Sequence, residues 1–205
     1  MLPPPSDSRL AIHGEQWFVR ARAALLGAVP CRKSCSRCCI GPFAITVLDA
    51  DAIQRGLPTL PEPIQRDIVG RARLQADEFA RAFPRLHEAP FVDEWPDEHM
   101  DQLAAQFADR PCPALDDGGA CRIYPFRPLA CRTMGIPIES NGLVTGACEV
   151  QTSVPLIRLS PTLREQEEAL AGQEAAALAA RCSTDSWRGT ELWLASGFIR
   201  DRPPG

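Results

Sequence analysis

Cysteine is the residue type in this sequence with the clearest chemical potential, because eight of its nine copies fall into two groups. The first group has a two-residue gap, which lets two thiolates bind one ion from a tight turn, and comprises Cys31, Cys35, Cys38 and Cys39. The second group is more widely spaced and comprises Cys112, Cys121, Cys131 and Cys148. Thiolates are soft ligands, so the two groups predict a site for zinc, an iron–sulfur cluster or cuprous copper.

The spacing limits the geometry of this site. The gaps of the second group are too wide for a zinc ribbon, in which two short knuckles repeat. Eight sulfurs could form two four-thiolate sites, one polynuclear site, or one site with spare thiols. Adjacent side chains usually point apart, so we expect Cys39 to reach a second metal or the far side of a cluster, away from Cys38.

Basic residues interleave both groups, and cations close to a thiol lower its pKa. They are Arg32, Lys33, Arg37, Arg122, Arg127 and Arg132. Solvated surface charge is the alternative interpretation. The ninth cysteine, Cys182, follows an alanine-rich stretch and is predicted to be a small buried core residue. The three histidines lie outside the cysteine groups and are predicted to lie on helix surfaces; they are His13, His87 and His99.

The composition is that of an ordinary globular protein, with 45% hydrophobic and 23% charged residues. A net charge of −4 argues against binding to nucleic acid or to an anionic membrane. No run of eighteen apolar residues is present, and the N-terminus lacks the features of a secretory signal. We therefore expect a cytoplasmic protein, in which metal binding is favoured over disulfides.

The positions of proline and the apolar periodicity predict a mainly α fold: a single irregular helical domain with cysteine-rich metal-binding loop segments. Asp49 is the expected N-cap of a short helix, and the last helix is expected to carry Trp187, Leu194 and Phe198. Helices are predicted over 8–28, 49–55, 61–83, 96–109, 160–181 and 186–200.

Residues 110–150 interrupt this helical pattern with prolines, glycines and aspartates. They have little capacity to form a hydrophobic core, so we expect a bound metal to hold them in place.

Several of these features together resemble the CxxCxxCC family, or YkgJ-like proteins, which are described as zinc- or iron-chelating domains. The resemblance is carried by the first cysteine group, by PCPAL at 111–115, by CRIYPFRPLACR at 121–132, and by Cys148. One departure is the three-residue gap between Cys31 and Cys35, where the family name implies two. The resemblance implies a zinc- or iron-chelating domain over 31–150. Outside it, the helical pattern predicts an N-terminal helix over 1–30 and C-terminal helices over 151–205, which we expect to pack on this domain.

The resemblance implies that the eight matching cysteines bind the metal, but it implies no reaction. The first hypothesis is a metal-chelating module with a structural, storage or sensing role, whose only predicted partner is the metal ion. The second is an enzyme that uses an iron–sulfur cluster or an open metal position, since the cysteine-rich part of flagellin lysine methylases is similar; no catalytic residue is assigned. The third is a thiol and metal redox switch centred on the pair Cys38 and Cys39.

Overall fold

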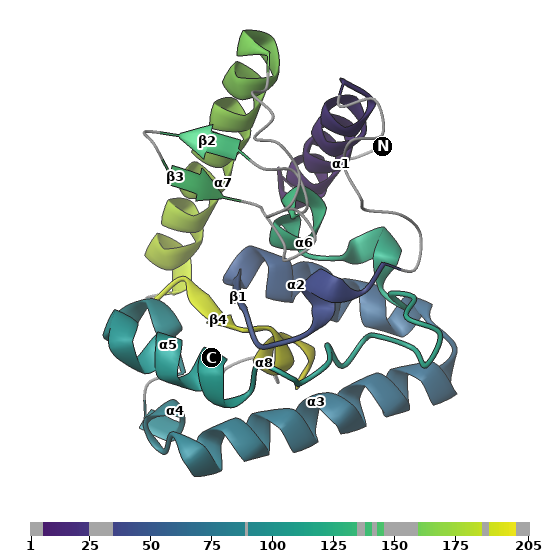
Figure 1. The fold of residues 1–205 in the computed structure, drawn as a ribbon, viewed down its shortest axis with the longest axis vertical. Coiled ribbons are helices and arrows are strands. Elements are labelled where there is room, and N and C mark those ends of the chain that lie inside the picture. The colour runs from purple at the N-terminus through teal and green to yellow at the C-terminus, as the bar shows by residue number, and fades with distance from the viewer. Residues whose placement is uncertain are drawn as a thin grey trace.

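Helices dominate the computed structural model, as the sequence predicts (Figure 1). The model describes residues 6–24, 35–88, 90–134, 138–140, 143–145, 160–185 and 189–199. The α-helices are α1 (Ser6–Ala24), α2 (Val47–Gly56), α3 (Glu62–Ala82), α4 (Arg85–Glu88), α5 (Asp97–Gln106), α6 (Leu129–Thr133), α7 (Pro161–Asp185) and α8 (Leu194–Ile199). The 3-10 turns are η1 (Arg37–Cys39), η2 (Leu57–Thr59), η3 (Val92–Glu94) and η4 (Tyr124–Phe126). The strands are β1 (Ala44–Thr46), β2 (Ile138–Ser140), β3 (Leu143–Thr145) and β4 (Glu191–Trp193).

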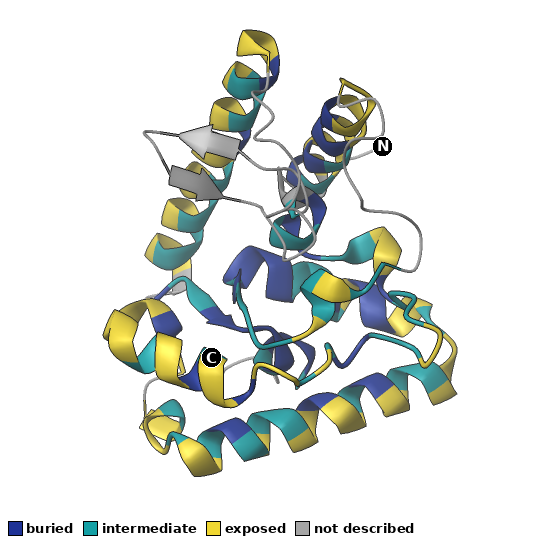
Figure 2. Cartoon of the chain, in the orientation of Figure 1, coloured by how far each residue is buried: buried dark blue, intermediate teal, exposed yellow. Residues whose placement is uncertain are grey.

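Helix α2 lies near the centre of the molecule, and most of its residues are buried (Figure 2). Its apolar residues Val47, Ala50 and Ile53 belong to the main core, together with residues of α3, β4 and α8. Helix α3 runs along the base of the molecule and exposes its outer face (Figure 2). Helices α1 and α7 pack against each other, and the indole Nε1 of Trp17 donates a hydrogen bond to the Leu163 carbonyl at 2.9 Å.

The two helices that the sequence defines best are α3 and α5, because a proline stands at the start of each. Pro63 lies in the first turn of α3, where its missing N–H is not needed, and Pro96 precedes α5 directly. Ile68 and Phe79 face the core from α3, and Leu103 does so from α5. These expectations are therefore confirmed.

The prediction of one helix over 186–200 is wrong. Residues Glu191–Trp193 form β4, which pairs antiparallel with β1 so that Leu192 lies opposite Ile45. Helix α8 begins only at Leu194, and Trp187 lies outside the described residues. A three-residue strand is too short to show an alternating pattern, and its partner lies far away in the sequence.

The prediction that Asp49 caps a helix is also wrong. Helix α2 begins at Val47, and the hydroxyl of Thr46 accepts a hydrogen bond from the Asp49 N–H at 3.3 Å. Asp49 is instead buried, and its carboxylate accepts a hydrogen bond from the backbone N–H of Leu129 at 2.7 Å. It therefore connects α2 to the start of α6.

Residues 110–134 contribute to the core, contrary to the expectation that only a metal would hold this region. Ala114 and Ile123 are almost fully buried in the main core, where Cys112 and Cys121 pack against the same cluster. Leu129 belongs to a second cluster with Leu10 and Leu48. The prolines and glycines break the periodicity, but they leave isolated apolar residues free to point inward.

None of the described helices is both long enough and apolar enough to cross a bilayer.

Candidate metal centre

Backbone hydrogen bonds bring the two cysteine groups together. The N–H of Cys112 donates to the carbonyl of Cys39 at 2.7 Å, and Ile40 forms a β-bridge with Pro111. The N–H of Gly41 then donates to the carbonyl of Arg110 at 2.7 Å. Gly41 has a positive φ of 89°, which glycine adopts without strain. The residue after η1 is thus tied directly to the start of the second group.

The loop between Cys112 and Cys121 closes on itself and carries both thiols back to one place. Leu115 forms a β-bridge with Cys121, and the carboxylate of Asp116 accepts a hydrogen bond from the Ala120 N–H at 2.7 Å. Gly119 completes the turn with a φ of 78°. Aspartate and glycine commonly stabilise tight turns in these two ways, by a hydrogen bond to the backbone and by a positive φ.

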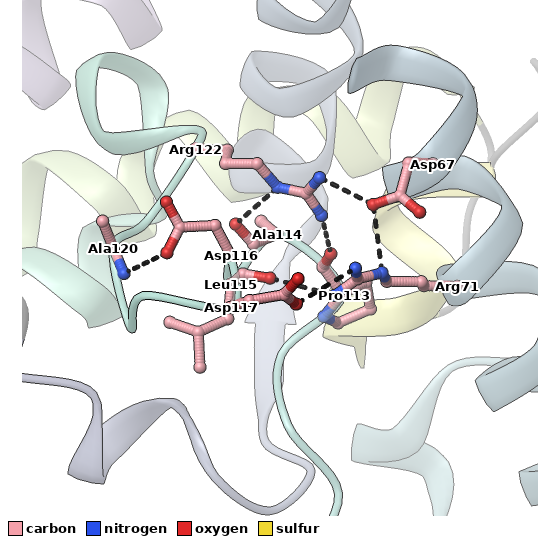
Figure 3. Close-up of polar contacts among 9 residues, drawn as sticks. All are labelled: Asp67, Arg71, Pro113, Ala114, Leu115, Asp116, Asp117, Ala120 and Arg122. Atoms are coloured by element: carbon pink, nitrogen blue, oxygen red, sulfur yellow. Dashed lines mark hydrogen bonds and ion pairs between the residues drawn. The ribbon is translucent and has the colours of Figure 1, made fainter. Parts of the chain in front are cut away.

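Arg122 clamps this loop onto α3 (Figure 3). Its guanidinium donates to the carbonyl of Pro113 at 2.9 Å and to that of Ala114 at 3.3 Å, directly after Cys112. The same group pairs with Asp67 of α3 at 2.6 Å. Because Arg122 follows Cys121, one side chain links the backbone next to both thiols to a rigid helix.

Helix α6, which carries Cys131, is held by a similar arginine. The buried Arg132 donates to the carbonyls of Pro125 and Arg127 at 3.0 and 3.2 Å. It also pairs at 2.6 Å with Glu15 of α1. Cys121 and Cys131 are thus each followed by an arginine that binds neighbouring backbone carbonyls and a carboxylate on another helix.

Six of the eight predicted ligands line one cavity of about 510 Å³. They are Cys35, Cys38, Cys39, Cys112, Cys121 and Cys131. Apolar side chains from other elements form most of the remaining wall: Phe18, Phe43, Leu115, Ile123, Met134 and Leu194. Cys31 and Cys148 lie outside the described residues.

Cys38 and Cys39 do not point apart, which corrects the expectation from the sequence. Both line the cavity, and the Cys39 thiol donates a hydrogen bond to the Cys38 sulfur. That hydrogen bond lowers the pKa of Cys38 to about 6 and raises the pKa of Cys39. The two thiols share one strongly held proton, so the pair loses its first proton easily and its second with difficulty.

Burial dominates the electrostatics of the other thiols. It raises the pKa of Cys112 to about 12, raises that of Cys121, and raises that of Cys131 well above its ordinary range. Arg127 and Arg122 act in the opposite direction on Cys121 but do not outweigh burial. Basic neighbours therefore do lower the pKa values of Cys112 and Cys121, as expected, but burial outweighs them and the net shift of all three thiols is upward.

The basic residues have mainly structural contacts. Arg127 stacks on Tyr124 with 4.0 Å between the guanidinium carbon and the ring centroid, and it pairs with Glu15 at 3.1 Å. Arg37 is exposed, whereas Arg32 and Lys33 lie outside the described residues. The interpretation as solvated surface charge thus fails for the arginines of the second group.

The other candidate residues lie away from the cavity. Cys182 is partly exposed near the end of α7, so the prediction of a buried core residue is wrong for it. None of the three histidines lines the cavity. All cysteines in the described part of the chain are free thiols.

The donor chemistry fits a soft metal, because six thiols face a common space and thiolates prefer zinc, iron–sulfur clusters and cuprous copper. Within the described ranges, no three His, Cys, Asp or Glu side chains stand ready to hold one ion. A metal would have to draw the sulfurs together and release the protons that burial retains on them.

Two residues that position the centre have roles that the sequence did not predict. Asp49 was expected to cap a helix, and the signal for its buried role is that it is the one acidic residue in an apolar stretch at 43–50. Glu15 pairs with both Arg127 and Arg132, but it lies in a polar part of α1 and no local signal distinguishes it.

An irregular thiol-lined cavity in a helical scaffold defines a class of soft-metal-chelating domain. The family comparison gives this class its name: residues 30–149, more than half of the chain, match the model of the CxxCxxCC family, "Putative zinc- or iron-chelating domain". The chain belongs to this family. Neither the curated proteins nor the solved structures give a match.

Proposed function

We propose that this protein binds zinc or iron through a centre of cysteine thiolates and acts as a metal-chelating module. The observation that carries the proposal is the convergence of six thiols from three separate segments on one cavity. The proposed ligands are Cys35, Cys38, Cys39, Cys112, Cys121 and Cys131, completed by Cys31 and Cys148.

The proposed centre joins parts of the chain that the fold already holds close together. Cys112 and Cys121 flank a loop clamped to α3, whereas Cys131 lies on a helix clamped to α1. A metal bound to all three would cross-link the two clamps. The free thiols favour a reducing compartment such as the cytoplasm, and the net negative charge is unsuited to nucleic acid or anionic lipid.

The test is anaerobic purification under reducing conditions, followed by metal analysis and an absorption spectrum of one sample. A colourless protein with stoichiometric zinc would support a chelating module. A brown protein with iron and acid-labile sulfide would support an iron–sulfur cluster. It would then favour the hypothesis of a modification enzyme over that of a chelating module. A protein without metal that still unfolds cooperatively would refute the proposal.

A matched pair of variants separates ligands from other cysteines. Cys121→Ser removes a proposed ligand, whereas Cys182→Ser makes the same chemical change away from the cavity. We expect the first variant to lose metal and stability together, and the second to keep both. Equal metal content in the two variants would exclude Cys121 as a ligand.

A second candidate function is a thiol redox switch, which the hydrogen bond between the Cys38 and Cys39 side chains favours. A Cys38 thiolate would be present at neutral pH and could react with an oxidant. Mild oxidation, in which two thiols lose two protons and pass two electrons to the oxidant, should then give one selective disulfide that includes Cys38. Mass mapping would reject this candidate if the pairing is random or if added thiol does not reverse it.

A further inference from the structure

The thiol-lined cavity is larger than a metal ion requires. A zinc ion lies about 2.3 Å from each thiolate sulfur, so an ion and its donors form a compact group. Pockets that bind small organic molecules typically have volumes of about 300–1,000 Å³. At about 510 Å³ this cavity falls within that range.

The part of the wall that cysteines do not form is chemically distinct. Besides Tyr124 and two arginines, it consists mainly of apolar side chains from separate parts of the fold, including Phe18 of α1, Phe43 before β1, Met134 after α6 and Leu194 of α8. Apart from the thioether of Met134, which can bind soft metals, these side chains do not coordinate metals, and they favour an apolar ligand. The cavity therefore offers both thiols and apolar side chains to a bound molecule.

Two residues mark where the cavity meets solvent. Tyr124 lines it and is 49% exposed, and Arg22 near the end of α1 lines it and is also exposed. The guanidinium of Arg127 also lines the cavity but is already paired with Glu15. Arg22 has no ion pair with any residue that the structure describes. One cationic group is thus available beside the opening.

We propose that this cavity binds a small organic molecule with an aromatic or aliphatic body and a carboxylate, with the body against the apolar wall and the carboxylate at Arg22. The planar guanidinium can donate two parallel hydrogen bonds to a carboxylate, which favours this group over a neutral polar end. The ligand would lie beside the thiol centre without replacing a cysteine. This site goes beyond metal chelation, since a chelating module needs no organic ligand.

The first experiment is isothermal titration of the protein as isolated anaerobically, with its metal content measured on the same sample. The probe is 4-phenylbutyrate, which combines a phenyl ring with a carboxylate. A ligand of this size in a suitable cavity should bind with a dissociation constant on the order of 0.1–1 mM. The amide and amine analogues of the probe, and butyrate without the ring, should each bind more weakly.

Matched variants then test the two halves of the site. Arg22→Gln should weaken 4-phenylbutyrate by about threefold to fivefold and leave its neutral amide unchanged, which a merely structural effect would not do. Arg9→Gln is the control, because Arg9 is an exposed arginine of the same helix outside the cavity. Leu115→Trp and, independently, Met134→Trp fill the apolar part and should weaken every probe by at least about tenfold.

Three results would overturn the proposal: no binding of 4-phenylbutyrate, equal binding of butyrate, or equal effects of Arg22→Gln and Arg9→Gln. Unchanged affinity in both cavity-filling variants would do the same. The metal analysis separates this outcome from the proposed function. A metal-loaded protein that ignores the probe refutes only the organic site, whereas a metal-free protein that binds the probe refutes only the chelating module.

Discussion

Arg122→Lys tests whether the arginine clamp positions the proposed ligands. Lysine keeps the positive charge, but its single ammonium cannot reach Asp67 and the carbonyls of Pro113 and Ala114 at once. Hydrogen bonds from a charged group contribute about 1.5–3 kcal/mol each, but they are not additive within one network. The Arg122 side chain is only 15% exposed, whereas Asp67 is 43% exposed, so solvent screens the ion pair and the carbonyl contacts carry most of the expected loss.

We therefore expect Arg122→Lys to lower the free energy of unfolding by about 1–3 kcal/mol in urea titrations. Because the loop that carries Cys112 and Cys121 would then be held less firmly, zinc binding should weaken by about 10- to 100-fold in a competition assay with a chromophoric chelator. Residues that orient metal ligands typically have effects of this size. Arg66→Lys is the matched control on α3, because Arg66 pairs with the exposed Glu62 at 3.8 Å and makes no contact with the loop carbonyls that the structure describes. It should change neither quantity measurably.

Two results would refute this reasoning in different ways. If stability falls but zinc affinity stays within about twofold of the wild type, the clamp supports the fold without setting the donor positions. If neither quantity changes relative to Arg66→Lys, the contacts of Arg122 with the loop carbonyls do not contribute.

Three further predictions follow from packing, burial and the position of the ninth cysteine. A Cβ at Gly56 would lie 2.3 Å from the ring of Phe126, so Gly56→Ala should lower stability in urea by about 1–3 kcal/mol, whereas Gly70→Ala, with no neighbour within 4 Å, should be neutral or slightly stabilising. Burial raises the pKa of Glu174 from 4.5 to about 7, so its contribution to stability should be present at low pH and be lost as the pH rises through this window. Glu174→Gln should reduce that pH dependence in unfolding curves, and a wild-type profile in this variant would contradict the assignment. Cys182→Ser should keep the wild-type ratio of metal to protein by mass spectrometry, and a lost metal equivalent would extend the centre to α7.

The sequence predicts those parts of the fold that depend on local signals. Prolines at 61, 63 and 96 define the starts of α3 and α5, and the Ser160-Pro161 pair defines the start of α7. The strand β4 could not be predicted, since its three residues acquire their conformation by pairing with β1. Local propensity contains no information about a partner so distant in the sequence.

For the candidate site, the sequence predicts the residue types but not their arrangement. Spacing and family resemblance identify the cysteines, and the described ones do share a cavity. The hydrogen bond between Cys38 and Cys39 depends on the 3-10 turn η1. A turn of three residues has no sequence pattern from which it could be predicted. The burial of Ala114 and Ile123 in the core could not be predicted, because prolines and glycines surround them and the apolar residues there show no periodicity.

The pairing of β4 with β1 has a consequence for biosynthesis. Leu194, directly after β4, forms part of the wall of the cavity that also contains Cys35 and Cys39. A ribosome releases the first cysteine group long before residues 191–199, and domains fold as their segments emerge. Until this late segment docks, the cavity of a nascent chain lacks the part of its wall that Leu194 forms. A metal that meets the chain before this docking would find a more open set of sulfurs than one that enters the finished cavity.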